Sequence, residues 1–258
     1  MARLAFVTGA SSGIGQALAV RLYQAGYRLA LVARRADDLR AWAGTEGWQP
    51  DRYQVYRADV EQVDSIVGAA QACIAAQGMP DLVIACAGIS VGVDTAHRED
   101  LDVMARVFAI NNLGMAATFH PFLEPMRSRG SGTLVGIASV NGIRGFPGHG
   151  AYCASKAAVI SYCESLRVEM RGTGVRVVTI SPGYIDTPLT QGNRYAMPFL
   201  MPAAAFADRA LAAIEAGVSY RVIPWQMAIV AGVLRVLPNG VFDRLFAGRA
   251  RKRRADEA

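Results

Sequence analysis

Short runs of aliphatic residues alternate along the chain with longer stretches in which apolar residues recur at helical spacing. The short runs predict strands at residues 4–8, 28–33, 54–57, 82–86, 133–137, 175–181 and 219–223. The longer stretches predict helices at residues 14–25, 36–43, 60–77, 101–129, 152–171 and 203–216. Strands and helices that alternate in this way are typical of a parallel sheet with crossover helices.

The predicted strands are apolar throughout and show no strict alternation of polar and apolar positions. This pattern indicates that both faces of the sheet are covered. The fold class is therefore α/β: a doubly wound parallel sheet, or Rossmann fold, with three layers in the order α/β/α. The length of 258 residues suits one domain, which we expect to span 1–248. Residues 183–202 form a long irregular insertion, and such stretches are often lids.

The composition excludes several other classes of protein. Hydrophobic residues make up 52% of the chain and charged residues 19%, which is too apolar for a disordered protein. Residues 249–258 carry a net +3 of the total charge of +6, so we expect a basic, disordered tail and no nucleic-acid-binding surface. Only Lys156 and Lys252 are lysines, and the internal Lys156 is a candidate for chemistry because an ammonium differs from a guanidinium.

An apolar helical extension is expected at residues 224–248. Every residue from 227 to 234 is apolar or glycine, so this helix has no polar face. A helix over residues 225–237 would be about 20 Å long, which is short of a hydrocarbon core of about 30 Å. It can pack on a second subunit or over the substrate pocket, which favours a homo-oligomer, a dimer or tetramer. With the following arginines, it can instead make a peripheral contact with an anionic membrane surface.

The expected location is cytoplasmic. No stretch is long and apolar enough to cross a membrane, and the first residues read as a strand rather than an export signal. The four cysteines show no paired spacing and are predicted to be reduced thiols. Peripheral attachment to a membrane through the apolar extension is the alternative.

The first predicted strand runs into a glycine-rich turn and then into an apolar helix. Glycines at such a turn let backbone amides approach a pyrophosphate, and the helix N-terminus adds a favourable partial charge. We therefore predict a dinucleotide site formed by Gly9, Ser11, Ser12, Gly13, Ile14 and Gly15.

The turn reads Thr8-Gly9-x-x-x-Gly13-x-Gly15, and Ser139 precedes the motif Tyr152-x-x-x-Lys156. In this order and spacing the chain resembles the short-chain dehydrogenase/reductase family over roughly residues 4 to 190. The resemblance also assigns cofactor contacts to Asp59 near the adenine ring, Gly88, Tyr152, Lys156, Pro182, Gly183 and Thr187, and it matches Asn111 with Gly114 to an N-x-x-G motif. One position departs from the family: Cys86 stands where an asparagine usually helps tie the sheet to neighbouring segments.

Tyr152 and Lys156 are four residues apart in a predicted helix, so they share one face. We expect the ammonium of Lys156 to lower the pKa of Tyr152 and make it a proton donor and acceptor. Ser139 ends a predicted strand, where it can hydrogen-bond a substrate oxygen. By the resemblance, Asn111 would hold a water that links Lys156 to solvent. His149 is predicted to be a rim or loop residue, and no histidine spacing suggests a metal site.

The second predicted strand ends Ala33-Arg34-Arg35, with no carboxylate to accept a hydrogen bond from a ribose 2′-hydroxyl. An arginine at this point pairs with a 2′-phosphate. The predicted cofactor is therefore NADP(H), although both arginines could also be merely solvated charges.

These features predict an NADP(H)-dependent oxidoreductase that interconverts a small hydrophobic ketone or aldehyde and its alcohol by hydride transfer, with Tyr152 as the acid and base. A 3-oxoacyl thioester reductase is an alternative within the family, and a non-catalytic nucleotide-binding regulator is a less favoured one. An apolar lid over the substrate is expected from Tyr195, Met197, Phe199, Leu200 and Met201. These residues could equally just pack the insertion onto the core.

Overall fold

A parallel seven-stranded sheet forms the centre of the protein in a computed structural model that describes residues 2–191, 193, 195–248 and 251–254. Its strand order is β3-β2-β1-β4-β5-β6-β9. The strands are β1 (Leu4–Thr8), β2 (Arg28–Ala33), β3 (Tyr53–Arg57), β4 (Leu82–Ala85), β5 (Gly132–Ile137), β6 (Val175–Pro182) and β9 (Tyr220–Ile223). The strand order reverses direction between β1 and β4, which is the switch point where doubly wound sheets place their ligands.

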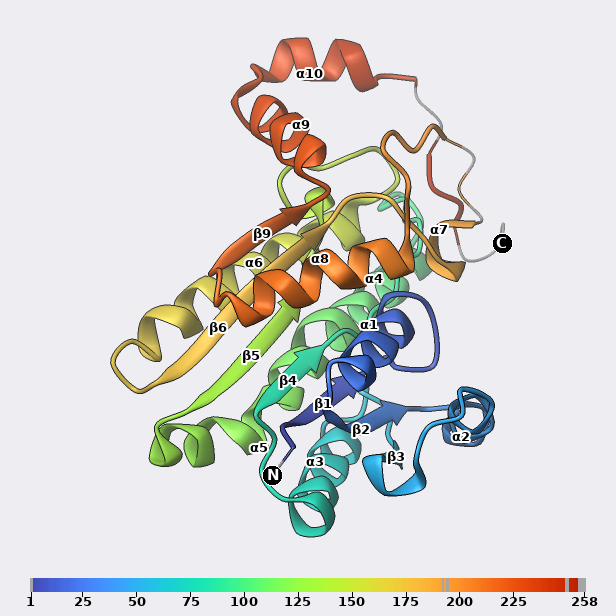
Figure 1. Ribbon diagram of the computed structural model, residues 1–258. Helices are drawn as coiled ribbons and strands as arrows, with labels where there is room; N and C mark the ends of the chain where they lie inside the picture. Colours follow the sequence, from blue (N-terminus) through green and yellow to red (C-terminus); the bar gives the residue numbers. More distant parts are fainter. Residues whose placement is uncertain (1, 192, 194, 249–250, 255–258) are drawn as a thin grey trace.

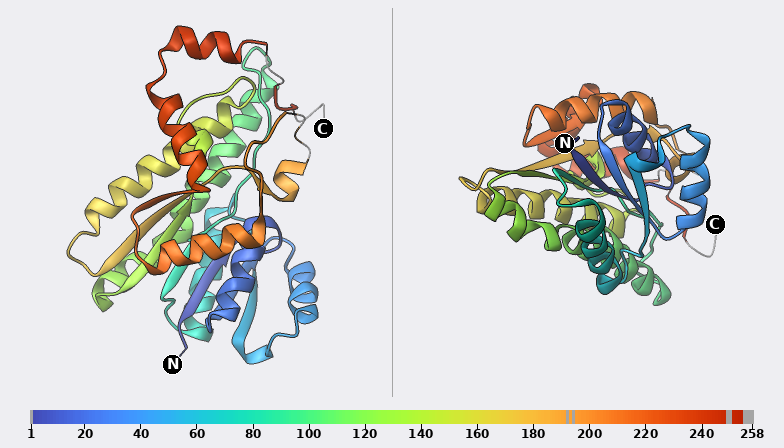
Figure 2. Two further views of the ribbon diagram at one scale, coloured as in Figure 1. Left: turned by 45° about the horizontal axis from the view of Figure 1, so that its top comes forward. Right: turned by 60° about the horizontal axis from the view of Figure 1, so that its bottom comes forward.

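Two helical layers cover the sheet. One layer holds α1 (Gly13–Gln24), α2 (Ala36–Thr45) and α8 (Ala203–Glu215), and the other holds α3 (Val63–Gln77), α5 (Gly114–Arg129) and α6 (Gly150–Glu169), with α4 (Glu99–Phe108) against α6. Figure 2 shows the layers on opposite sides of the sheet. Along β1, Ala5 and Val7 enter one core while Leu4 and Phe6 enter the other, because successive side chains of a strand point to opposite faces. The fold class predicted from the sequence is confirmed.

The predicted helix at residues 101–129 is interrupted. The π-helical turn η2 (Ala109–Leu113) separates α4 from α5. A π-helical turn shifts the helical register by one residue and often occurs at functional sites, and here it carries Asn111. Apolar periodicity continues through such a turn, which is why the sequence predicts a single helix.

Short elements fill the remaining connections. They are η1 (Pro50–Arg52), η3 (Val140–Gly142), β7 (Ile185–Asp186), α7 (Pro188–Gln191) and β8 (Met201–Pro202). The insertion predicted to be irregular thus contains a two-stranded pair, β7-β8, and one turn of helix.

The apolar extension forms α9 (Trp225–Val236) and α10 (Asn239–Phe246), which project beyond the carboxyl ends of the strands in Figure 1. Met227 and Ala231 are buried, whereas Trp225, Ile229, Val233 and Val236 follow one another along an exposed stripe of α9. Within the described chain α9 is therefore only half covered. Across the described residues, no helix has both the length and the apolar character needed to span a membrane.

The described part of the C-terminal tail differs from the disordered segment expected from the sequence. Residues 251–254 lie against the loop that follows β4, where the amide of Gly92 donates a hydrogen bond of 2.9 Å to the carbonyl of Arg253. Arg251 and Arg254 form ion pairs with acidic residues of that region. Charge composition alone predicts a solvated tail, but these arginines have carboxylate partners far away in the sequence.

Candidate active site

A cavity of about 490 Å³ opens at the carboxyl edge of the sheet. It is lined by nearly all of the site residues predicted from the sequence: Gly9, Ser11, Ser12, Gly13, Ile14, Gly15, Arg34, Arg35, Asp59, Gly88, Ser139, Tyr152, Lys156, Pro182, Gly183 and Thr187. Asn111 is the exception and lies behind the cavity wall. The fold therefore brings segments from the whole chain into one site.

The glycine-rich turn between β1 and α1 is packed so tightly that a side chain is excluded at Gly9 and Gly15. A Cβ on Gly15 would lie 2.3 Å from the carbonyl oxygen of Gly9. Gly9 itself has a φ of +68°, a conformation that favours glycine. The backbone of the turn, next to the N-terminus of α1, can therefore lie directly against a phosphate group.

The two arginines predicted to select the cofactor lie at the end of β2, exposed at the rim of the cavity. Arg34 Nη1 is 3.9 Å from a carboxylate oxygen of Asp59, and Arg35 Nε is 3.8 Å from one of Asp38. Both distances are too long for hydrogen bonds. Both guanidinium groups consequently retain donors that a phosphate could use.

Ser139 and Tyr152 meet in the cavity. Ser139 ends the segment after β5 and is the N-cap of η3, where its hydroxyl accepts a hydrogen bond of 3.2 Å from the amide of Asn141. A hydrogen bond between the Ser139 and Tyr152 side chains lowers the pKa of the tyrosine, but burial outweighs it and raises the pKa to about 12. Tyr152 is therefore a neutral phenol near pH 7.

The expected lowering of the Tyr152 pKa by Lys156 is corrected by the structure. Lys156 Nζ donates a hydrogen bond of 2.8 Å to the carbonyl of Ile137 and lies 5.8 Å from the centre of the Tyr152 ring. Burial also lowers the pKa of Lys156 to about 8. The spacing of four residues does place both side chains on one face, but the ammonium is directed to the strand end rather than to the phenol oxygen.

Asn111 is buried and fully hydrogen-bonded. Its Nδ2 donates to the carbonyl of Ile89 at 3.0 Å and to Ser155 Oγ at 2.9 Å, and its Oδ1 accepts from the amide of Ile89 at 2.9 Å. These bonds tie the π-helical turn to the loop after β4. The water-holding role expected from the resemblance stays a prediction.

Cys86 occupies the position where the family has asparagine, and its surroundings show how the sheet is tied without that side chain. The amides of Cys86 and Ala87 donate to Thr8 Oγ1 at 3.1 and 3.3 Å, which joins β4 to β1. Burial raises the pKa of the Cys86 thiol to about 12, so the thiol stays neutral.

The sequence misses a second group of cavity residues. His149, Asn193 and Lys252 also line the cavity, next to Tyr195, which was expected there as a lid residue. His149 lies in the loop before α6, which was one of its two predicted places, and it is buried. The rings of His149 and Tyr195 are in contact with their centres 5.5 Å apart. The scarcity of lysine in this chain was the one signal that could have singled out Lys252.

The expected apolar lid is only partly present. Of its five residues, Tyr195 alone lines the cavity. Phe199 and Leu200 are exposed, while Met201 packs into the core below α1 and α8. The insertion contains β7 and β8, and this pairing turns Met201 toward the core.

A doubly wound sheet whose switch-point cavity joins a glycine-rich turn to a serine, a tyrosine and a lysine defines a Rossmann-fold oxidoreductase site. Comparison with known proteins gives the family. The model of the short chain dehydrogenase family matches residues 3–197. The chain is 39% identical over 244 residues to an uncharacterized oxidoreductase of Myxococcus xanthus, covering 93% of this chain and 95% of that one. The chain therefore belongs to the short-chain dehydrogenase/reductase family, whose members use a nicotinamide cofactor.

Solved structures support the fold. A short chain dehydrogenase from Burkholderia cenocepacia J2315 in complex with NADP has a TM-score of 0.81 at 23% identity, covering 96% of this chain and 98% of that one. A member from Burkholderia phymatum in complex with NAD has a TM-score of 0.80 at 23% identity, covering 90% of this chain and 92% of that one. The two neighbours bind different cofactors, so they leave the choice between NAD and NADP to the residues of this chain.

Proposed function

We propose that this chain is an NADP(H)-dependent oxidoreductase that interconverts a hydrophobic ketone or aldehyde and its alcohol. The observation that supports it is a single cavity lined by the glycine-rich turn, by Arg34 and Arg35, and by Ser139, Tyr152 and Lys156. Each of these groups suits a different part of one reaction, and no other arrangement of the described residues offers the same combination.

The residues present fit the cofactor. The turn at residues 9–15, which has no room for a side chain at Gly9 and Gly15, would hold the pyrophosphate, and Asp59 would lie near the adenine. Arg34 and Arg35 have unused donors for a 2′-phosphate, which is the reason to propose NADP(H) rather than NAD. Gly88, Lys156, Pro182, Gly183 and Thr187 would line the nicotinamide half. Bound NADPH supplies a hydride for the carbonyl carbon.

The protein's own groups handle the proton and the oxygen. Burial keeps Tyr152 protonated, with a pKa of about 12, which is the form that donates a proton to a developing alkoxide. Ser139 lines the same cavity as Tyr152, and its hydroxyl can donate to the same substrate oxygen and hold it in place. Lys156 is buried in the same cavity, where its ammonium is held by the carbonyl of Ile137 and would lie beside the nicotinamide half of the bound cofactor.

A 3-oxoacyl thioester reductase uses the same groups and differs only in what fills the outer part of the cavity. A regulator that binds a nucleotide without turnover would not need Ser139, Tyr152 and Lys156 to line the same cavity as the glycine-rich turn. Enzymatic reduction is thus the function that this geometry supports best.

A screen of ketones, aldehydes and acyl thioesters for NADPH oxidation at alkaline and neutral pH tests the proposal. We expect turnover with at least one carbonyl class and slower turnover when NADH replaces NADPH. Tight NADPH binding with no oxidation by any class, alongside tight binding of the oxidised cofactor, would favour the regulator instead.

The homo-oligomer and the membrane contact remain predictions about the exposed stripe of α9. We expect Ile229→Glu together with Val233→Glu to reduce the oligomeric state in light scattering, because a charge cannot be buried in an apolar interface. A membrane contact would be identified instead if wild type sediments with anionic vesicles and the double variant does not, while both proteins have the same oligomeric state.

A further inference from the structure

Residues 251–254, here called the C-terminal strap, contribute Lys252 to the lining of the cavity, near His149, Asn193 and Tyr195. The strap passes between the loop after β4 and the loop before α6. A Cβ on Gly92 would lie 2.3 Å from the carbonyl oxygen of Arg253, and one on Gly148 would lie 2.9 Å from Cβ of Arg251. Both loops therefore have a glycine where the strap crosses them, and the backbone of the strap fills the space that side chains would take.

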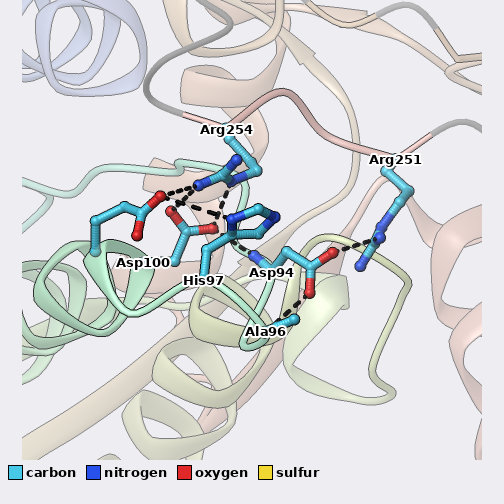
Figure 3. A network of polar contacts seen from close by, with 7 residues as sticks. Asp94, Ala96, His97, Asp100, Arg251 and Arg254 are labelled. Carbon is cyan, nitrogen blue, oxygen red and sulfur yellow. Dashed lines mark hydrogen bonds and ion pairs between the residues drawn. The ribbon is translucent and has the colours of Figure 1, made fainter.

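Ion pairs hold the strap at both ends (Figure 3). Arg254 Nε lies 2.8 Å from the buried carboxylate of Asp100 and also pairs with Glu99, at the start of α4. Arg251 pairs with Asp94 at 2.8 Å. The pKa of Asp100 is lowered by its hydrogen bond from Arg254. The two arginines thus serve to anchor the strap.

Lys252 lies between these anchors and differs from them. It is half-buried and lines the cavity, where its Nζ donates to Asn193 Oδ1 at 3.3 Å. No carboxylate in the described chain lies within ion-pair distance of it. Burial lowers the pKa of Lys252, which is the expected effect when an ammonium loses water without gaining a counter-ion.

His149 supplies an independent sign of a ligand. It is 6% exposed and lines the same cavity, and its Nδ1 has no hydrogen-bond partner among the described residues. Burial and the charge of Lys252 lower its pKa to about 4, so the imidazole is neutral. His149 thus has a buried polar atom without a hydrogen-bond partner, and the ammonium of Lys252 has no counter-ion. Both cost free energy unless a ligand contacts them.

We propose, on the basis of the proposed function, that the substrate is an oxo-acid or hydroxy-acid whose carboxylate binds Lys252 at the strap while its carbonyl or alcohol faces Tyr152. Lys252 is then a specificity residue brought to the site from the other end of the chain. His149 and Asn193 complete the polar end of the pocket.

A carboxylate fits better than a phosphate. The pocket end offers one cation and neutral groups, which balance a single negative charge, whereas phosphate dianions usually meet arginine clusters or helix N-termini. The lining of the same cavity also includes the apolar side chains of Ile89, Ile110, Val140 and Leu189. This arrangement suits a hydrocarbon chain between carbonyl and carboxylate.

Calorimetry on the full chain saturated with NADP⁺ tests the proposal. The probes are linear oxo-acids of increasing chain length, each compared with its own methyl ester. We expect at least one acid to bind about tenfold or more tightly than its ester, and Lys252→Met to abolish this difference. Lys252→Arg should retain much of it. Arg253→Met, which removes an exposed positive charge from the same strap, is the matched control and should leave the difference intact.

Binding is independent of turnover, so the two proposals fail separately. Absence of NADPH oxidation with intact, Lys252-dependent binding of an acid would overturn the proposed function only. If wild type reduces acids and their esters with equal KM, and Lys252→Met has the same KM values, only the role of Lys252 would be overturned. Where turnover is present, Lys252→Met should raise KM for the acid and leave kcat close to the wild-type value.

A second variant tests the strap as the positioning element. Gly92→Ala would place a methyl group against the carbonyl of Arg253, and it should reproduce the loss seen in Lys252→Met without changing any cavity side chain. Gly145→Ala, in a loop where a methyl group meets nothing within 4 Å, is its control. Wild-type preference for the acid in Gly92→Ala would show that the strap does not position the lysine.

Discussion

The cofactor end and the substrate end of the cavity are built in opposite ways. The cofactor end consists mainly of residues that follow the carboxyl ends of β1, β2, β3, β4 and β6, so that the sheet itself sets their positions. At the substrate end, His149 precedes α6, Asn193 and Tyr195 belong to the insertion, and Lys252 comes from the strap. One end is therefore specified by local motifs, and the other by contacts between segments that are distant in sequence.

This difference separates chemistry from specificity. The chemical groups stand on rigid elements, since Tyr152 and Lys156 share one helix and Ser139 ends a strand segment. Under the proposal made above, selection of the substrate would depend on loops and the strap, which can vary without disturbing the sheet. Variants at the two ends should consequently differ in which kinetic constant they change.

The largest effect is expected at the chemical groups. Tyr152→Phe should lower kcat by a factor on the order of 10² to 10⁴, because the phenol is the proposed proton donor. Cofactor affinity should change little, since the ring remains in place. Stopped-flow or steady-state rates of NADPH oxidation measure the change in kcat, and calorimetry measures the cofactor affinity.

Tyr162 on the same helix is the matched control, being at the exposed face ten residues further on. Tyr162→Phe should be indistinguishable from wild type in both measurements. Turnover in Tyr152→Phe within a few-fold of wild type would remove Tyr152 from the mechanism.

The same contrast explains how much the sequence alone could predict. The bounds of β1 and β2 are predicted to the residue, because each is a short apolar run closed by turn residues. The glycine-rich turn and the Tyr152-x-x-x-Lys156 motif are local patterns, and the structure brings them into one cavity as expected. The π-helical turn at Asn111 is not predicted, because it depends on tertiary packing against Ile89 and Ser155.

Long-range contacts account for the rest of what the sequence misses. The strap looks like a solvated basic tail until Asp94 and Asp100 are brought opposite it by the fold. The sign of the Tyr152 pKa shift is likewise missed, since spacing gives the neighbour but not the burial that outweighs it. Burial and long-range ion pairing belong to the fold as a whole, and no local pattern encodes them.

A smaller effect is expected at the substrate end, in the pH dependence of stability. The pKa of His149 is lowered from 6.5 to about 4, so as pH falls through this window the unfolded chain takes up a proton before the folded chain does. Because of this group, the free energy of unfolding of wild type should fall by up to about 3 kcal/mol between neutral pH and pH about 4. Above pH about 7 the imidazole is neutral in both the folded and the unfolded chain, so it should cause no pH dependence there.

His149→Gln removes this titration. Urea unfolding across the window should show the variant gaining stability relative to wild type as pH falls, whatever its stability at neutral pH. Parallel curves for the two proteins would mean that His149 titrates as in the unfolded chain and that its surroundings are wetter than the cavity wall implies.

The smallest effect returns to the cofactor end. Arg34→Ala removes one of two guanidinium groups that are free to contact a 2′-phosphate, and it should reduce an NADPH preference of about tenfold or more to near unity, a change of about 1.4 kcal/mol. NADH affinity should be unchanged or slightly improved, because a cofactor without the phosphate gains nothing from the arginine. Calorimetric dissociation constants for both cofactors give the ratio.

The matched control for this last change is Arg40→Ala, an exposed arginine on α2 that pairs with Asp37 and does not line the cavity. It alters net charge by the same amount, so any general electrostatic effect on the more highly charged NADPH appears in both variants. A loss of preference in Arg34→Ala alone assigns the discrimination to a contact at the end of β2. Equal dissociation constants for NADPH and NADH in wild type would instead mean that this rim of the cavity does not select the cofactor. The contrast between the cofactor end and the substrate end of the cavity would then depend on the result for Tyr152 alone.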